Sequence, residues 1–299
     1  MLGGSQPLAD SVMVEQEIAS PNAREVQYWN SITTQVWADQ HETVDRLFAG
    51  LTQVVLELAA PAPGERVIDI GCGSGTTVLE LAKYVGPGGY VLGADVSRHF
   101  VERARERIAA AGIRNANVLL ADVSTHAFQP HSFDLAFSRF GVMFFADPIA
   151  TFTKLHNAMK TRGRLAFAAF RTAEENSWCT AAFKAVQNLL PLVPPSESKE
   201  TGQFSWADPA RVRRILESAG FQNFSLTPHD PLIELAGPGG AEAAADFAMH
   251  VGPIARAAQG VSAQQQKAVR ASLKNFFQSH DSPRGIVLPG AIWVVRARA

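Results

Sequence analysis

The 299-residue sequence has few cysteines, no excess of charge of one sign and no long apolar stretch. Its two cysteines, Cys72 and Cys179, are too few and too far apart for a disulfide framework or a cysteine zinc site. The 27 Lys and Arg residues balance 28 Asp and Glu residues, for a formal net charge of -1. The sequence therefore lacks the basic excess that binds nucleic acids or anionic membranes, and we expect neither as a partner.

Signals for export and membrane insertion are also missing. Residues 1–22 contain no basic stretch followed by an apolar run, and nowhere do about 18 apolar residues stand together. Because the two cysteines show no sign of pairing, a reducing compartment is the default. We expect a cytoplasmic protein.

Glycine and proline divide the chain into four regions. Apolar residues recur at helical spacing from Val44 to Leu58, and the Pro-Ala-Pro-Gly stretch at 61–64 ends them, which predicts an N-terminal helical cap over 1–60. From 61 to 230, short apolar runs alternate with amphipathic helices, a pattern typical of βαβ units on a parallel sheet. The Ala- and Gln-rich span 231–289 is predicted to form a helical lid, and 290–299 a final edge strand.

Within this α/β region the individual elements follow from apolar runs and helix-start signals. Ser97, Asp147 and Asp208 are predicted helix starts, the last two because proline follows the acid. A helix over 178–190 is expected to end at a proline break over 191–195. The predicted strands cover 67–70, 91–94, 118–120, 133–137, 165–170 and 221–226.

A predicted strand that runs into a glycine-rich turn and then a helix carries the strongest chemical signal. It reads Val-Ile-Asp69-Ile-Gly71-Cys72-Gly73-Ser74-Gly75-Thr-Thr. Glycines in such a turn let a ligand approach the backbone where a side chain would clash. The Asp-x-Gly-x-Gly-x-Gly spacing differs from the dinucleotide pattern Gly-x-Gly-x-x-Gly, and no lysine follows as in a phosphate loop. Taken alone, the turn is also compatible with a purely structural role.

Two further acids stand at the ends of later predicted strands. Asp95 follows the glycines at about the 20-residue interval at which a carboxylate meets ribose hydroxyls in this architecture. Its alternative role is to cap the helix that begins near Ser97. Asp122 could accept an adenine amino hydrogen while the apolar Val96 and Val123 flank the ring, or it could be a solvated loop acid.

These motifs, followed by Phe-Asp-Leu-Ala-Phe-Ser-Arg-Phe at 133–140, resemble the class I S-adenosylmethionine-dependent methyltransferases. Within that class the sequence is similar to the small-molecule branch of ubiquinone and menaquinone biosynthesis methyltransferases. The resemblance covers roughly 66–170 and extends more weakly to 28–30, Trp37, the Trp178 segment and 288–295. It implies an α/β, Rossmann-like seven-stranded sheet with an antiparallel last strand, to which the residue patterns above add the helical cap and the helical lid insertion. The chain departs at Thr-Arg-Gly-Arg, residues 161–164, where relatives commonly have Pro-Gly-Gly, which leaves the geometry of that turn open.

The resemblance also implies S-adenosyl-L-methionine as cofactor and assigns its contacts position by position. Tyr28 and Trp37 are nominated to cover the methionine end, although both could instead pack the cap against the core. The remaining contacts are Asp69, Gly71, Cys72, Gly73, Ser74 and Gly75 for the methionine part, Asp95 for the ribose, Val96, Asp122 and Val123 for the adenine, and Ser138, Arg139 and Phe140 beside the sulfonium.

Methyl transfer needs alignment in a water-poor pocket, and a base is optional. His250 is the candidate base, with a packed or surface histidine as the alternative. None of the eight histidines has a metal-ligand spacing, so no metal site is predicted. Apolar residues after the fourth and fifth strands predict a pocket for a small aromatic or lipid-like acceptor, unless they are core beneath the cap. The predicted pocket residues are Met143, Phe144, Phe145, Trp178 and Phe183, with Arg171 and Arg256 as charges that could orient an anionic substrate or could be structural.

We therefore expect O-, N- or C-methylation of a small-molecule acceptor. A nicotinamide-dependent oxidoreductase is one alternative, but the glycine spacing and Asp122 argue against it. A non-catalytic S-adenosylmethionine-binding protein is the other, since fold does not fix function. The acceptor atom and the oligomeric state do not follow from the sequence.

Overall fold

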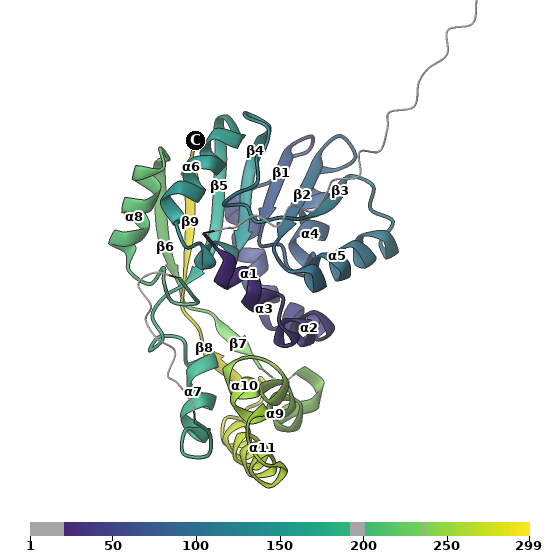
Figure 1. Cartoon of the computed structure of the whole chain (residues 1–299), viewed down its shortest axis with the longest axis vertical. Helices are drawn as coiled ribbons and strands as arrows, with labels where there is room; N and C mark the ends of the chain where they lie inside the picture. Colours follow the sequence, from purple (N-terminus) through teal and green to yellow (C-terminus); the bar gives the residue numbers. More distant parts are fainter. Residues whose placement is uncertain (1–20, 192–200, 236) are drawn as a thin grey trace, which may run out of the picture.

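The computed structural model describes residues 21–191, 201–235 and 237–299. Residues 1–20, which hold most of the segment searched for an export signal, therefore lie outside the described residues. Most of the predicted proline break at 191–195 lies outside them as well. A seven-stranded sheet has the order β3-β2-β1-β4-β5-β9-β6, and a two-stranded sheet pairs β7 with β8 (Figure 1). The strands are β1 (Arg66–Ile70), β2 (Tyr90–Asp95), β3 (Ala116–Leu120), β4 (Phe133–Arg139), β5 (Met159–Phe170), β6 (Gln222–His229), β7 (Leu232–Glu234), β8 (Val287–Pro289) and β9 (Ile292–Arg298).

Helices connect the strands and extend beyond them at both ends. Ser97, Asp147 and Asp208 each accept a backbone N–H at the start of a helix, so the three predicted helix starts are confirmed. The helices are α1 (Ala23–Trp29), α2 (Ile32–Asp39), α3 (His41–Ala59), α4 (Thr76–Val85), α5 (Arg98–Ala110), α6 (Pro148–Ala158), α7 (Ser177–Val186), α8 (Pro209–Ser218), α9 (Gly240–His250), α10 (Pro253–Gln259) and α11 (Ala263–Gln278), with short 3-10 turns at Gly141–Phe144 and Gly237–Gly239.

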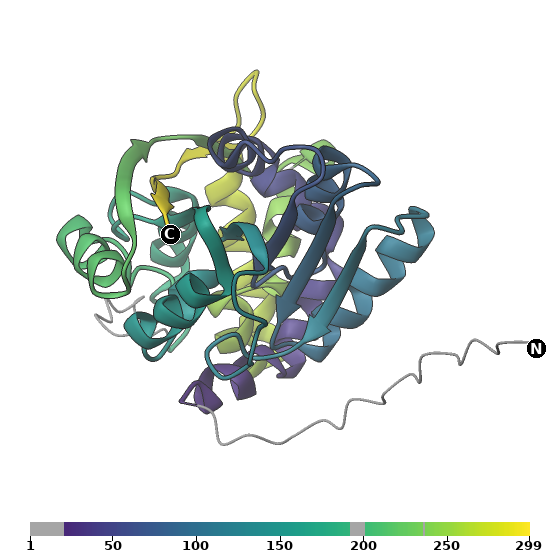
Figure 2. The same ribbon diagram turned by 90° about the horizontal axis from the view of Figure 1, so that it is seen from above.

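The strand order reverses between β1 and β4, and this reversal positions the site. From β1 the chain moves to β2 and then β3 on one side, whereas from β4 it moves to β5 on the other. Parallel crossovers are right-handed, so the connections on the two sides lie on opposite faces of the sheet. Figure 2 shows helices on both sides of the strands. At such a reversal, the carboxyl ends of neighbouring strands leave a crevice for a ligand.

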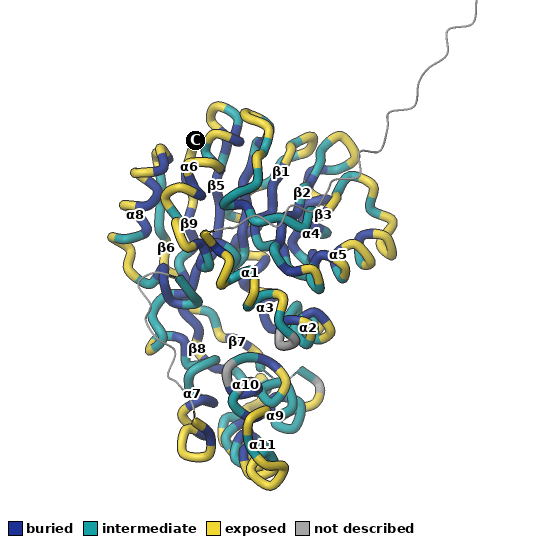
Figure 3. The backbone as a smooth tube through the Cα atoms, viewed as in Figure 1, coloured by how far each residue is buried: buried dark blue, intermediate teal, exposed yellow. Residues whose placement is uncertain are grey.

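The central strands are buried on both faces, as parallel strands covered by helices must be. Val67, Ile68 and Ile70 of β1 are at most 1% exposed, and β4 is buried from Leu135 to Ser138. Figure 3 shows this buried centre beneath the exposed outer surfaces of the helices. Helix α3, the predicted cap helix, covers β4, β5 and β9 with a face that includes Leu51 and Val55. The predicted cap helix and the five early strands are confirmed.

Two sequence predictions about the sheet are wrong. The last strand is not at an edge, because β9 pairs antiparallel with both β5 and β6. Its Ile292, Val294 and Val295 are buried from both faces, and β6 takes the edge. In addition, β5 begins at Met159, so 161–164 lie within the strand instead of before it. A register shift opposite Phe133 accompanies this irregular start.

A second, smaller core lies at one end of the molecule, where Figure 1 shows α7, α9, α10 and α11 together. It is formed by buried residues of these helices, among them Phe183, Val269 and Leu273. The span 231–289 is helical as predicted, but it also contains β7 and β8, which the helical pattern did not reveal. Helix α7 joins this core although it precedes the span, because Phe183 and Val186 face α11. We call α7, α9, α10 and α11 the lid bundle.

Candidate active site

A cavity of about 190 Å³ lies at the carboxyl ends of β1, β2, β3 and β4. This is far more than the roughly 10–15 Å³ that one water molecule requires. One wall consists of the turns that follow these strands, and the facing wall consists of side chains from α1, α2 and α3. The predicted site residues that line it are Trp37, Gly71, Cys72, Gly73, Ser74, Asp95, Val96, Asp122, Val123, Arg139, Phe140, Phe144 and Phe145.

The three glycines of the turn meet different physical requirements. A Cβ on Gly71 would lie 2.6 Å from the Cα of Gly141, so glycine here allows two turns to touch. A Cβ on Gly75, which does not line the cavity, would lie 2.9 Å from the Cβ of Ala104 on α5. Gly73 lines the cavity with φ at +54°, and no protein atom lies within 4 Å of the position of its Cβ. The backbone at Gly73 is therefore the part of the turn that is open to a ligand.

Asp95 supports the turn and also lines the cavity. Its Oδ2 accepts the N–H of Gly73 at 2.8 Å, and its Oδ1 accepts the N–H of Ser97 at 2.9 Å. Burial raises the pKa of Asp95 to about 6, against the lowering effect of these backbone bonds. An ionised carboxylate offers about four lone-pair sites, so both oxygens can still accept from a ligand hydroxyl. The helix-start role and the ligand role considered for Asp95 are thus compatible.

Asp122 is tied to the N-terminal segment. Its Oδ1 accepts the N–H of Ser124 at 2.9 Å and the Nδ2 of Asn22 at 3.1 Å. Asn22, itself only 4% exposed, also accepts the N–H of Ala146 at 2.7 Å through its Oδ1. Asp122 therefore belongs to a bonded network at the cavity wall, which does not fit the alternative of a solvated loop acid.

Asp69 and Ser138 lie behind the turn and do not line the cavity. Both are fully buried. Ser138 donates to the carbonyl of Ile70 at 2.7 Å and accepts the N–H of Gly141 at 3.1 Å, so it joins the two turns. Asp69 accepts a short hydrogen bond from Thr77, and burial raises its pKa to about 7. Direct contact of these two residues with a cofactor, as expected from the sequence, does not fit their placement.

Arg139 brings a buried charge to the cavity wall. Its guanidinium donates to the Oγ1 of Thr52 at 2.6 Å and lies 5.7 Å from the centre of the Phe48 ring. Burial lowers the pKa of Arg139, while the carboxylates of Asp45 and Asp69 act in the opposite direction. Two nearby carboxyl groups therefore oppose the effect of burial on this charge.

Aromatic rings line both walls of the cavity. Trp29 stands edge-on to Phe144, with ring centres 5.0 Å apart, and also contacts Phe100. Tyr28 does not line the cavity and packs against Trp29 instead. Neighbouring helix residues point about 100° apart, so Trp29 takes the position that the sequence analysis assigned to Tyr28.

Several predicted pocket residues lie away from the cavity. Met143 is buried, and its sulfur accepts the N–H of Phe170. Trp178 packs behind the wall on Phe48, whereas Phe183 belongs to the lid bundle. The structure thus brings only Phe144 and Phe145 of the predicted aromatic pocket to the cavity.

The predicted charged and basic groups are also elsewhere. Arg171 pairs with Asp230 at 2.6 Å and with Glu175, which leaves it engaged outside the cavity. His250 is exposed at the end of α9, with its Nδ1 2.7 Å from the carbonyl of Asp246. The side chain of Arg256 is outside the described part of the structure. The placement of His250 therefore gives no support to a role as base.

The sequence analysis missed one face of the cap. Besides the predicted Trp37, the side chains of His41, Val44, Asp45 and Phe48 line the cavity from α3. They recur at steps of three and four residues, the spacing of one helical face, and this signal could have identified them. Within the described ranges, no group of His, Cys, Asp and Glu could hold a metal, and no helix is long and apolar enough to cross a membrane.

The groups that line the cavity suit S-adenosylmethionine. Asp95 supplies a carboxylate for a diol, the backbone at Gly73 is accessible, and Val96, Phe100 and Val123 offer an apolar slot for a purine. All of these groups face one cavity.

Comparison with known proteins identifies the family of this chain. The profile of a family described as methyltransferase domain matches residues 61–220. The chain is 30% identical to an aklanonic acid methyltransferase of Streptomyces sp. (strain C5), over 61% of this chain and 82% of that protein. It is 27% identical to a demethylmenaquinone methyltransferase of Corynebacterium kroppenstedtii, over 60% and 76%. In fold it is similar to phosphoethanolamine N-methyltransferase 2 of Haemonchus contortus, with TM-score 0.57, 16% identity and coverage of 94% and 60%.

The family match decides against a nicotinamide-dependent oxidoreductase. The cofactor of this chain is S-adenosyl-L-methionine. The chain belongs to the methyltransferase domain family and is a class I S-adenosylmethionine-dependent methyltransferase.

Proposed function

We propose that the enzyme methylates a small, largely apolar aromatic acceptor. The observation that carries this proposal is that the glycine turn and a set of aromatic rings line the same cavity. Flat apolar side chains favour a flat apolar ligand through burial and ring contacts. The relatives named for aklanonic acid and demethylmenaquinone support a small-molecule acceptor.

In this proposal the strand-end wall holds the cofactor. Asp95 accepts the ribose hydroxyls, Gly73 allows close approach of the methionine part, and Asp122 with Val123 borders the adenine. When bound, S-adenosylmethionine supplies a methyl carbon activated by a positive sulfur. The chain's own contribution is to orient the acceptor and exclude water, which the wall of Trp29, Phe144 and neighbouring rings supports.

An acceptor panel with matched members tests the proposal. Purified protein is incubated with labelled S-adenosylmethionine and 2-naphthol, 2-naphthylamine or 2-naphthoic acid, and in parallel with cyclohexanol, cyclohexylamine or cyclohexanecarboxylic acid. Mass spectrometry identifies the methylated products. We expect kcat/KM at least about tenfold higher for the naphthyl member of a pair, since a ring contact and added apolar area are worth about 1.4 kcal/mol or more. Equal transfer to both members would contradict an aromatic acceptor.

A variant of the wall provides the structural control. Phe144→Ala removes a ring that lines the cavity. We expect it to raise KM for the naphthyl acceptor and to leave the Kd for S-adenosylhomocysteine unchanged. Phe276→Ala removes a ring of the lid bundle that lies outside the cavity and should leave both values unchanged. If the two variants had the same KM for the naphthyl acceptor, the ring of Phe144 would have no role in binding it.

A further inference from the structure

A histidine lines the cavity from the helix wall. His41, the first residue of α3, is half-buried and lines the cavity next to Trp37 and Val44. Of the histidines in the described ranges, no other lines this cavity. The carboxyl ends of β1, β2 and β3 are taken by the groups proposed to hold the cofactor, so the helix wall that carries His41 and the turn after β4 remain for the acceptor.

The hydrogen bonding of His41 fixes which nitrogen can take a proton. Its Nδ1 lies 3.1 Å from the carbonyl oxygen of Ala38. A carbonyl only accepts, so Nδ1 is the donor, and in the neutral ring Nε2 holds the lone pair. Nothing in the described part of the chain is hydrogen-bonded to Nε2. The contact of Nδ1 with the carbonyl of Ala38 holds the ring in place and leaves Nε2 available to accept a proton, as a general base requires.

We propose that His41 is the general base of this methyltransferase and that its acceptor carries a neutral hydroxyl group, a phenol or an enol. This inference rests on the proposed function and narrows its acceptor class. An ionised carboxylate has no proton to lose, whereas a phenol becomes a strong nucleophile only as its proton leaves. A basic nitrogen in a cavity that is also lined by aromatic rings fits the phenol or enol.

The step balances in atoms and charge. The O–H bond of the acceptor breaks and its proton goes to Nε2 of His41, while the oxygen forms a bond to the methyl carbon. The methyl–sulfur bond breaks with its electron pair on sulfur, which loses its positive charge. The positive charge ends on the imidazolium of His41, near a cavity wall whose charged residues are Glu25, Asp45, Asp95, Asp122 and Arg139.

The tautomer can be measured without an acceptor. Long-range proton–nitrogen correlation spectra of histidine-labelled protein with S-adenosylhomocysteine should show His41 with a protonated Nδ1 and a bare Nε2, its signals assigned by their loss in His41→Gln. His280, whose Nδ1 lies 2.8 Å from the carbonyl of Phe276 outside the cavity, is the reference for this pattern. A proton on Nε2 of neutral His41 would overturn the proposal.

Kinetics test the role itself, with 2-naphthol as acceptor. His41→Gln should lower kcat about 100-fold or more and remove the acidic limb of the pH profile of kcat, because general bases contribute about 10²–10⁴-fold. The Kd for S-adenosylhomocysteine should stay within about twofold. His280→Gln, a matched change outside the cavity, should leave all three quantities as in the parent protein.

The outcomes separate this inference from the proposed function. Unchanged kcat in His41→Gln, or a loss confined to cofactor affinity, would overturn the role of His41 and leave aromatic methylation standing. Transfer to 2-naphthylamine or 2-naphthoic acid but not to 2-naphthol would overturn the hydroxyl acceptor alone. Protein that binds S-adenosylhomocysteine but methylates no naphthyl acceptor would overturn both.

Discussion

Asp45 on α3 and Arg107 on α5 form an ion pair, with the Asp45 Oδ2 2.7 Å from the Arg107 Nη2. The Nη1 of Arg107 also donates to the carbonyl of Ser74 at 2.8 Å and to the Oγ1 of Thr76 at 3.0 Å. Thr76 in turn donates a short hydrogen bond to the other oxygen of Asp45. Both charged side chains are only 22% exposed. The pair thus connects the N-terminal cap directly to the glycine turn.

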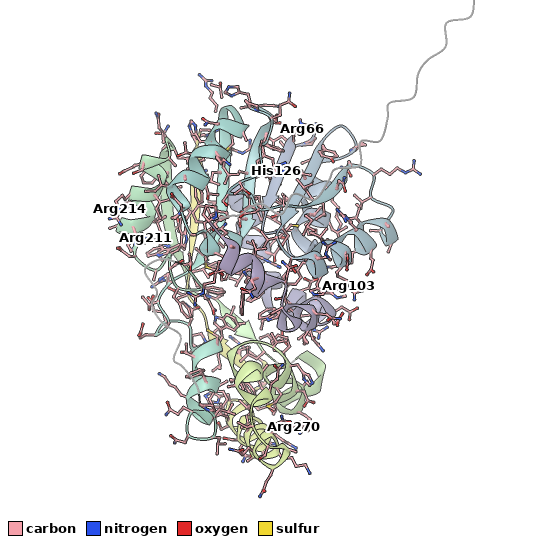
Figure 4. All side chains as sticks on the ribbon, viewed as in Figure 1. Arg66, Arg103, His126, Arg211, Arg214 and Arg270 are labelled. Carbon is pink, nitrogen blue, oxygen red and sulfur yellow. The ribbon has the colours of Figure 1, made fainter. Side chains whose placement is uncertain are left out.

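This connection predicts that Arg107→Met weakens cofactor binding although Arg107 itself does not line the cavity. Loss of its hydrogen bond to Ser74 should loosen the turn, and charged hydrogen bonds are worth about 1.5–3 kcal/mol. We expect the Kd for S-adenosylhomocysteine to rise about tenfold in calorimetry. Arg103→Met is the control, because Arg103 pairs from the same helix with Asp39 on α2 but not with the turn. Figure 4 labels Arg103 on this helix. Equal effects of the two variants would show that only charge matters.

The glycine turn gives a second prediction. Gly73→Val should retain the fold, because no protein atom lies within 4 Å of its Cβ position, at a cost of about 1–2 kcal/mol for the left-handed backbone. Binding of S-adenosylhomocysteine should be lost, because the side chain projects where a ligand must approach. Gly112→Val is a matched control, with φ at +64°, open space and a position outside the cavity. If Gly73→Val bound the ligand as tightly as Gly112→Val does, the turn would be purely structural.

The sequence predicted elements defined by short-range patterns. The strand at 67–70, the glycine turn and the helix starts at Ser97, Asp147 and Asp208 follow from neighbours in the chain. The interior place of β9 did not follow, because an apolar run of that length suits an edge strand or a covered one. For the same reason the sequence could not assign Phe183 to the lid bundle, since apolar spacing shows that a face is buried but not against what.

The candidate site was predicted best where a residue's role depends on the strand that precedes it. Asp95 and Asp122 end parallel strands, and such ends meet at one edge of a sheet. His41 and Asp45 reach the cavity only because α3 packs across β4 and β5, which is a tertiary arrangement. His250 was placed wrongly because apolar neighbours in sequence do not reveal which cavity a helix end faces.

Asp95 gives a prediction about pH. Its raised pKa of about 6 means that the carboxyl group is ionised at pH 8 and becomes protonated as the pH falls below about 6. Only the ionised form accepts two hydroxyl protons, so the affinity for S-adenosylhomocysteine should be constant above about pH 7 and fall below pH 6. Asp95→Asn should lose about tenfold or more in affinity at pH 8, because a charged acceptor is removed.

The same variant should also lose the pH dependence. Calorimetry between pH 5 and 8, with circular dichroism to check folding at each pH, gives both values. A fall in affinity below pH 6 that persists in Asp95→Asn would assign the titration to another group, such as Asp69, whose pKa burial raises to about 7.

The lid bundle gives the last prediction. Trp37 of α2 and Phe247 of α9 meet edge-on with ring centres 6.5 Å apart, so the cap and the lid bundle touch beside the cavity. A ligand that fills the cavity contacts Trp37 and should hold both segments closed over it. Hydrogen exchange should therefore slow at the amides of 28–37 and 247–255 when S-adenosylhomocysteine is added.

Helix α8 supplies the internal control, because it packs on α6 and β6 and lines no part of this cavity. Its amides should exchange at the same rate with and without the ligand. The Trp37→Ala variant should retain slowing at 71–122 but lose it at 247–255, because the ring that transmits closure to Phe247 is gone. Protection confined to 71–122 in the parent protein would mean that the cap and lid bundle are static packing.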